Sequence, residues 1–190
     1  LPEPDVNLIP CANGVYDLTT KQLRNFRHDD YFTWKLPWDY NPDAISELVI
    51  PLLESFLPKE ETITLYELIA YCLYRAYPYQ KLFMLYGRGL NGKSLFAKIL
   101  ETLLGIDNVS HTSMGEIQKS RFAASELYQK FANICGELEY DEIKDTRLLK
   151  QLCGGDTIQA DRKFRSPIYF KNHAKLIFLT NEVPMSRDTT

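Results

Sequence analysis

The sequence predicts an α/β protein of three layers, in which helices cover both faces of a mostly parallel sheet. From Lys81 onward, apolar runs of strand length alternate with stretches at helical spacing. The apolar runs are continuous, which is typical of strands buried on both faces of a parallel sheet. We expect these strands at Leu82–Tyr86, Phe131–Cys135 and Leu176–Leu179. Helices are expected at 94–104, about 121–129 and 145–153.

The first 80 residues predict a small α+β module, so we divide the chain into residues 1–80 and a core at 81–190. Asn13-Gly14 is a turn signal that enters a strand at Val15–Leu18. The aromatic residues between positions 31 and 40 favour packing in a core over stacking on nucleobases. Two amphipathic helices should follow, the first opened by Asn41–Asp43 and the second between Pro58 and Pro78. We interpret them as a helical collar with a scaffold role.

The composition is that of an ordinary globular domain. The chain has 190 residues, 25% of them charged, and a formal net charge of -3. This charge excludes a protein that binds nucleic acid through its overall positive charge, so any such binding must rest on a local patch. The four cysteines contain no CxxC pair, which favours buried reduced thiols over a disulfide or a zinc site. No apolar run is long enough to span a membrane, and we expect a cytoplasmic location, in the host cell if a virus or plasmid encodes the protein.

The segment Gly87–Ser94, GRGLNGKS, predicts a nucleotide site. It fits the pattern GxxxxGK[ST] and lies between an apolar strand and a helix. Glycines allow successive backbone N–H groups to surround phosphate oxygens, and the helix adds its positive N-terminal end. We expect Lys93 to bind the β- and γ-phosphates of ATP and the Ser94 hydroxyl to bind Mg²⁺. The other nucleotide-binding residues are expected to be Gly87, Gly89, Asn91 and Gly92.

Polar residues follow the two later strands, where catalytic groups are expected. Glu137 and Glu139 come directly after the strand that ends at Cys135. A carboxylate there can bind Mg²⁺ through water or polarise the attacking water, and we favour Glu137, with Glu139 as the second choice. Asn181 follows the last strand, where its amide can hydrogen-bond both the attacking water and a γ-phosphate oxygen. We therefore predict Lys93, Glu137 and Asn181 as the catalytic residues, with Ser94 and Glu137 as the metal ligands.

A basic hairpin is predicted between the carboxylates and the last strand. Thr157–Ala160 can pair with Pro167–Phe170, which leaves four residues near the tip, namely Arg162, Lys163, Phe164 and Arg165. Basic groups hold phosphates, and an aromatic ring can contact a sugar or base. We expect this tip to bind DNA, mainly through Lys163. The alternative is a solvated basic hairpin with Phe164 packed inward.

Taken together, GRGLNGKS, FANICGELE, LLKQLCGGDTIQADRKFRSPIYF and AKLIFLTNEVP resemble the superfamily 3 helicase core of viral, phage and plasmid primase-helicases. Val6–Ile9 and Asn13–Leu18 are similar to the module that precedes that core. The resemblance implies an AAA+ ATPase fold and replicative unwinding by a ring, usually a hexamer, that moves along single-stranded DNA. It also implies that Lys93, Ser94, Glu137 and Asn181 are the functional residues of the ATPase site, and that the basic hairpin binds DNA.

One element of that family is missing from this sequence. The family uses an arginine finger, downstream of the sensor asparagine, that a neighbouring subunit inserts into the ATP site. Only Arg187 lies there, so we expect the finger beyond Thr190 and weak ATP hydrolysis by this chain alone. The alternative function is a nucleotide-gated DNA-binding initiator or loader module without motor activity. A phosphoryl-transfer kinase is a distant third, because no acceptor pocket or lid is apparent.

Overall fold

The computed structural model of the chain describes residues 3–120, 122–136 and 146–182. Its main sheet has four parallel strands in the order β4-β9-β6-β5. Their bounds are β4 Phe83–Tyr86, β5 Val109–Ser110, β6 Ala132–Cys135 and β9 Lys175–Thr180. The predicted α/β class is confirmed. β9, the last of these strands along the chain, lies between β4 and β6 in the sheet, and every one of its residues is buried.

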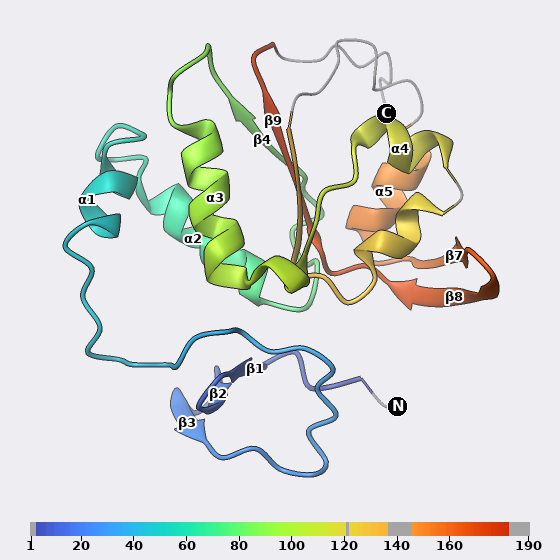
Figure 1. The fold of residues 1–190 in the computed structure, drawn as a ribbon, viewed down its shortest axis with the longest axis horizontal. Coiled ribbons are helices and arrows are strands. Elements are labelled where there is room, and N and C mark those ends of the chain that lie inside the picture. The colour runs from blue at the N-terminus through green and yellow to red at the C-terminus, as the bar shows by residue number, and fades with distance from the viewer. Residues whose placement is uncertain (1–2, 121, 137–145, 183–190) are drawn as a thin grey trace.

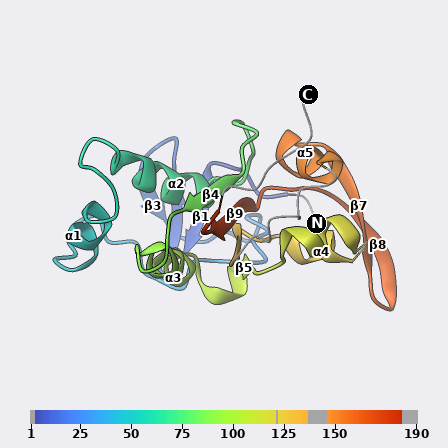
Figure 2. The same ribbon diagram turned by 90° about the horizontal axis from the view of Figure 1, so that it is seen from above.

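The sheet separates two apolar cores, as the alternation of side chains along its strands requires. One core joins Ile177 and Leu179 of β9 to side chains of α1 (Val49–Glu54), α2 (Ile63–Leu73) and α3 (Lys93–Leu104). The other joins Leu176 and Phe178 of the same strand to α4 (Met114–Lys119) and α5 (Arg147–Gly154). Figures 1 and 2 show these two helical layers on either side of the sheet. The predicted three-layer arrangement is therefore present.

Two predicted helices differ from the observed ones. The first collar helix begins at Val49 rather than near Asn41, because Pro51 has no N–H and fits only the first turn of a helix. Before it, the Ser46 hydroxyl accepts a hydrogen bond from the Val49 N–H at 3.0 Å. The helix expected at 121–129 is a short 3₁₀ segment, η2 Ala123–Leu127.

Three short elements were not predicted, namely β5, the 3₁₀ turn η1 Ile106–Asn108 and α4. Helix α4 begins with a capping box, in which the Ser113 side chain and the Glu116 side chain each bond the other residue's backbone N–H. These bonds satisfy N–H groups that a six-residue helix cannot pair internally.

The N-terminal residues form a separate antiparallel sheet of β1 Leu8–Cys11, β2 Gly14–Asp17 and β3 Gln22–Arg24, at the bottom of Figure 1. The predicted turn at Asn13-Gly14 joins β1 to β2. The aromatic segment runs on from this sheet, and Trp34 packs edge-on against Phe131 with ring centroids 4.4 Å apart. Ile9 and Cys11 also belong to the core that contains α3. The division of the chain at residue 80 stays a prediction.

Three of the four cysteines are buried and all four are free, as predicted for reduced thiols. No helix in the described ranges is long and apolar enough to cross a membrane.

Lys175, at the start of β9, is fully buried. Its ammonium group donates hydrogen bonds to three backbone carbonyls, those of Tyr74 (2.7 Å), Ala76 (3.0 Å) and His173 (2.8 Å). It also lies 4.4 Å from the centre of the Tyr71 ring. The side chain thus ties the C-terminal end of α2 to the base of the sheet. Burial lowers the pKa of Lys175 to about 7.

This pKa predicts that stability rises with pH near neutrality. The unfolded chain keeps the Lys175 proton up to about pH 10.5, whereas the folded chain releases it near pH 7. The unfolded state therefore binds more protons in this window, and the free energy of unfolding should increase by about 1–2 kcal/mol between pH 7 and 8.5. Urea unfolding at both pH values measures it, and Lys175→Met should remove most of the increase. An equal increase in the free energy of unfolding of Lys175→Met would contradict the assignment of this pH dependence to Lys175. The control is Lys171→Met, which replaces an exposed lysine and should keep the increase.

Candidate functional site: a phosphate-binding loop beside a sensor amide

The predicted phosphate loop connects β4 to α3 at the upper edge of the sheet in Figure 1. Helix α3 begins at Lys93, and Gly92 precedes it in the left-handed conformation with φ +85°. A Cβ on Gly92 would lie 2.5 Å from Cε1 of Phe56. Both the left-handed backbone and this close contact therefore disfavour a side chain at position 92. A Cβ on Gly89 would meet no atom within 4 Å. The folded chain therefore requires glycine at position 92 and leaves room at position 89.

Lys93 lies at the centre of the loop. Its ammonium group donates a hydrogen bond to the Gly87 carbonyl and another, 3.0 Å long, to Oδ1 of Asn91. A further bond of 3.0 Å reaches Oδ1 of Asn181. A fourth, longer bond of 3.4 Å reaches the Arg88 carbonyl. All four acceptors are neutral oxygen atoms, so within the described residues no bonded carboxylate offsets the positive charge of Lys93. A cation held in this way attracts an anionic ligand.

Parallel pairing brings Asn181 to Lys93 across 88 positions of sequence. In the register of β4 and β9, Tyr86 lies opposite Thr180, and the Gly87 N–H donates to the Thr180 carbonyl at 3.3 Å. The loop and the amide therefore leave the sheet from neighbouring strands at the same edge. The structure thus places Asn181, the predicted sensor residue, beside the predicted phosphate loop.

The residues around the loop suit a triphosphate. Helix α3 has 12 residues, with no acidic residue in its first turn and no side-chain cap at its N-terminus. Its first N–H groups and its positive dipole end are thus available to phosphate oxygens. Ser94 is exposed on the first turn, where its hydroxyl can reach a metal ion bound to the phosphates.

The predicted carboxylates cannot be placed with the other residues. Glu137 and Glu139 lie outside the described residues, as does Arg187. The strand that precedes them, β6, pairs with β9 so that Cys135 lies opposite Phe178. Within residues 3–120, 122–136 and 146–182, no group of three or more His, Cys, Asp or Glu side chains is arranged to hold a metal ion.

The predicted hairpin is formed by β7 Thr157–Arg162 and β8 Arg165–Lys171, with Lys163 and Phe164 in the turn. Phe164 is 94% exposed, so the alternative in which its ring packs inward is wrong. The Lys163 ammonium lies 5.3 Å from the centre of that ring. Arg162 and Arg165 face each other across the two strands next to the turn. The structure therefore brings the four predicted tip residues together, at the far right of Figure 2.

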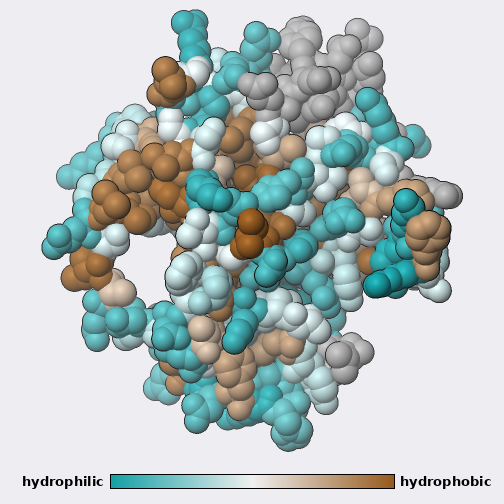
Figure 3. All heavy atoms as spheres, viewed as in Figure 1, coloured by the Kyte–Doolittle hydropathy of each residue, from teal (hydrophilic) through white to brown (hydrophobic). Residues whose placement is uncertain are grey.

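Two cavities lie at opposite edges of the main sheet. One, of about 380 Å³, borders Asn91, Gly92 and Lys93 and is lined otherwise mainly by apolar side chains, among them Phe56 and Leu68. Apolar surface beside a phosphate-binding loop suits a nucleotide. The hydrophobic surface over α1 and α3 in Figure 3 belongs to the same end of the molecule.

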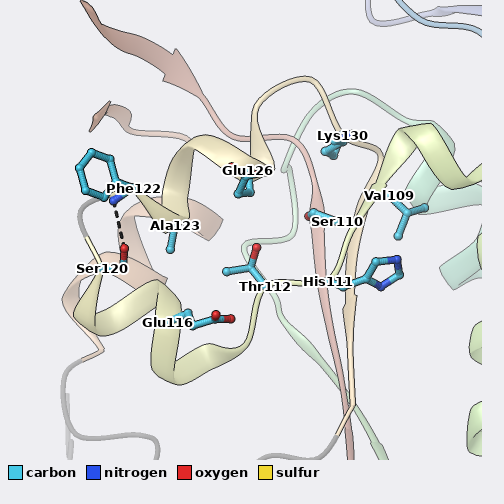
Figure 4. A pocket seen from close by; sticks show the side chains of 10 residues that line it. All are labelled: Val109, Ser110, His111, Thr112, Glu116, Ser120, Phe122, Ala123, Glu126 and Lys130. Atoms are coloured by element: carbon cyan, nitrogen blue, oxygen red, sulfur yellow. Dashed lines mark hydrogen bonds between the residues drawn. The ribbon is translucent and has the colours of Figure 1, made fainter. Parts of the chain in front are cut away.

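The other cavity, of about 500 Å³, lies beside β5 and is shown in Figure 4. Its lining is mixed, with Thr112, Glu116 and Glu126 beside apolar residues such as Val109 and Phe122. Two strands separate β5 from β4, so this cavity is not part of the phosphate loop.

Sequence reasoning missed Phe56, whose ring lies against Gly92 and packs edge-on to Phe96 with centroids 6.3 Å apart. No local sequence pattern predicts this contact, because Phe56 follows α1 in the N-terminal segment and is distant in sequence from Gly92. It also missed Asn133, which is fully buried in β6. Its side chain bonds the Ser110 hydroxyl and the backbone of Thr112, each at 2.9 Å, and so holds the segment after β5 in place.

Comparison with known families matches both parts of the chain. Residues 85–190 match a family described as "Family of unknown function (DUF5906)", and residues 2–59 match "D5 N terminal like". Two curated viral proteins, each named "Putative helicase", are 29% identical to the chain. One is from Acanthamoeba polyphaga mimivirus and aligns with 93% of the chain, and the other is from Invertebrate iridescent virus 6 and aligns with 95%. The chain spans 20% of the length of each.

Among solved structures, the fold is similar to two apo structures of the NrS-1 C-terminal region. Their TM-scores are 0.59 and 0.57, at 20% and 21% sequence identity. Each similarity covers 73% of this chain and 34% of the other. With the two family matches and the viral relatives, this fold confirms the resemblance to the helicase core of superfamily 3 primase-helicases.

Two of the three glycines of the loop, Gly92 and Gly89, should respond differently to substitution. Gly92→Ala forces a side chain into the left-handed conformation against Phe56, and we expect a loss of about 1–3 kcal/mol of stability. In a domain of this size that corresponds to a fall in melting temperature of roughly 2–10 °C. Gly89→Ala should change the melting temperature by less than about 2 °C without ligand. Thermal unfolding without nucleotide measures the melting temperatures of both variants. Equal changes in the two variants would contradict the loop conformation in the structure.

Proposed function

Since the chain belongs to the family of unknown function DUF5906, its activity has to be inferred from its site, and we propose that it is an ATP-dependent DNA helicase subunit of a replicative primase-helicase. The two viral relatives named as helicases support a helicase-related function. The observation that carries the proposal is the position of Lys93, bonded both to the phosphate loop and to Asn181. A site of this kind senses whether a γ-phosphate is present.

ATP would bind with its phosphates along the loop. Lys93 would exchange its bonds to Asn91 and Asn181 for oxygens of the β- and γ-phosphates, and the N-terminus of α3 would bind the same anion. Asn181, released from Lys93, would then hydrogen-bond the attacking water and a γ-phosphate oxygen. A single side chain thereby changes partner between the free and the bound chain. This exchange gives the sheet edge two states that depend on the nucleotide.

The metal site would include the Ser94 hydroxyl, because it lies on the first turn of α3 next to Lys93. Glu137 is our candidate for the carboxylate that binds the metal ion or polarises the water. When bound, Mg²⁺ neutralises charge that develops on the phosphate oxygens.

The DNA site would be the hairpin tip. Lys163 and Phe164 occupy the turn, with Arg162 and Arg165 directly behind them. Three basic side chains and one exposed ring offer salt-dependent phosphate contacts and one stacking surface. Single-stranded DNA is the partner that uses both.

We propose a ring of six subunits in the longer protein, with each ATP site completed by an arginine of the neighbouring subunit. A donated arginine is worth roughly 10³ or more in rate. The 190-residue chain should therefore bind ATP well and hydrolyse it slowly. A version extended past Thr190 should hydrolyse faster, and faster still with single-stranded DNA. Equal, DNA-independent turnover in both would favour a self-contained ATPase over the ring.

Substitution of the two bonded residues should separate binding from hydrolysis. Lys93→Ala should weaken ATP binding by at least about tenfold, because it removes the cation at the centre of the loop. Asn181→Ala should leave ATP affinity within about threefold and lower hydrolysis by roughly 10²-fold. Titration with a fluorescent ATP analogue and a phosphate-release assay on the extended chain measure the two effects. Unchanged turnover in Asn181→Ala would refute its role as the sensor.

Lys163→Ala tests the DNA site. It should abolish unwinding and weaken binding of single-stranded DNA while ATP affinity stays unchanged, since the hairpin of β7 and β8 and the loop before α3 lie on different sides of the sheet in Figure 1. The control is Lys98→Ala, which removes an exposed lysine of α3 that pairs with Glu101. Intact DNA binding and unwinding in Lys163→Ala would exclude the hairpin as the DNA contact. Tight ATP binding without turnover in any version would favour a nucleotide-gated loader.

A further inference from the structure

The hairpin has two faces of different character, set by the alternation of its strands. On one face, Ile158, Ala160 and Phe170 are buried in the core that contains α4 and α5. Phe170 also packs edge-on against Tyr128 of the main body, with ring centroids 5.2 Å apart. This face anchors the hairpin, so the other face has a stable orientation.

The other face is largely exposed, with the half-buried Asp161 on it near the tip. Its cross-strand pairs are Thr157 with Lys171 and Gln159 with Tyr169, and all four residues are exposed. Tyr169 is 68% exposed although it sits in the middle of a strand. Directly opposing side chains in an antiparallel pair lie about 5 Å apart, so Gln159 borders the Tyr169 ring.

Charge on this face continues from the tip toward the base. Lys171 lies two positions beyond Tyr169 on the same strand face, and Arg165 lies at the tip end of the strand. From Arg165 to Lys171 the strand spans about 20 Å at the usual rise per residue. At the spacing of stacked bases this length matches roughly six nucleotides. The Tyr169 ring therefore lies between two cations on a strand of suitable length, although the pairing is irregular between Ala160 and Arg162.

We propose that this outward face, with Tyr169 at its centre, is a second contact surface for single-stranded nucleic acid, on which one base stacks against the Tyr169 ring while Lys171 holds a flanking phosphate. The inference rests on the proposed function, because it extends the DNA site from the tip to the strand face. Gln159 contributes a polar group beside the ring that can bond a base edge without choosing one base.

The chemistry of the face favours nucleic acid over a protein partner. A protein interface gathers apolar side chains at its centre and places charge at its rim. Here the single ring stands among polar and charged side chains, of which Asp161 is the one acid, and the apolar Ile158, Ala160 and Phe170 lie on the opposite face. Stacking on an isolated aromatic ring between cations is typical of sequence-tolerant binding to single strands.

The test is fluorescence anisotropy of a fluorescein-labelled dT oligonucleotide with the 190-residue chain and its variants. Tyr169→Ala should raise the Kd by about tenfold, and Tyr169→Phe should keep it within about twofold, because a phenyl ring still stacks. Lys171→Ala should lower the slope of log K against log salt by about 0.7, the contribution of one phosphate contact on a single strand. Tyr79→Ala is the matched control, since Tyr79 is also 68% exposed and lies outside the hairpin.

The results of these titrations test the Tyr169 contact and the proposed DNA-binding function separately. If Lys163→Ala weakens binding and Tyr169→Ala does not, DNA contacts the tip alone and the inference is wrong while the proposed function stands. If the unmodified chain binds no oligonucleotide, both fail together. An equal loss in Tyr169→Phe would assign the contact to the hydroxyl and overturn the stacking role. In the remaining case, Tyr169→Ala changes self-association and leaves DNA affinity unchanged. Sedimentation velocity detects this change, and the result would overturn the proposed DNA contact at Tyr169.

Discussion

The parallel pairing of β4 with β9 is the constraint on which the rest of the site depends. It places two chain segments, far apart in sequence, at the same edge of the sheet, and the Gly87 N–H bonds the Thr180 carbonyl there. Lys93 then bonds Asn181 directly. A slip of one residue in this register would turn every side chain of β9 to the opposite layer, which two separate cores prevent.

Sequence reasoning predicted best where one local pattern sufficed. Continuous apolar runs indicated the three long strands, and the glycine-lysine pattern indicated the loop, because each depends on residues adjacent in sequence. It failed where side chains or prolines set the boundary, as at α4 with its Ser113 cap and at α1 with Pro51. Lys93 and Asn181 were both predicted as catalytic residues, but the bond between them follows only from the order of strands, which no local pattern specifies.

Buried polar side chains hold the ends of the sheet. Lys175 ties the base of β9 to the end of α2, and Asn133 holds the segment that follows β5. Asn172, 3% exposed, bonds the carbonyls of Leu152 in α5 and Ala174 just before β9. These side chains pair with buried backbone groups or with another buried side chain. Each therefore holds a loop in one conformation where apolar packing alone would allow several.

The position of Asn172 also relates the two proposed sites. The hairpin ends at Lys171, Asn172 begins the short turn after it, and β9 then runs through the buried centre of the sheet to Asn181. Because every residue of β9 is buried, and the strand pairs with β6 over Lys175–Phe178 and with β4 over Ile177–Thr180, it cannot bend without disturbing both cores. This one buried strand therefore joins the base of the hairpin to the Asn181 amide, which is bonded to Lys93 at the phosphate loop. The chain thus places a proposed DNA contact and a proposed phosphate sensor at the two ends of one rigid element.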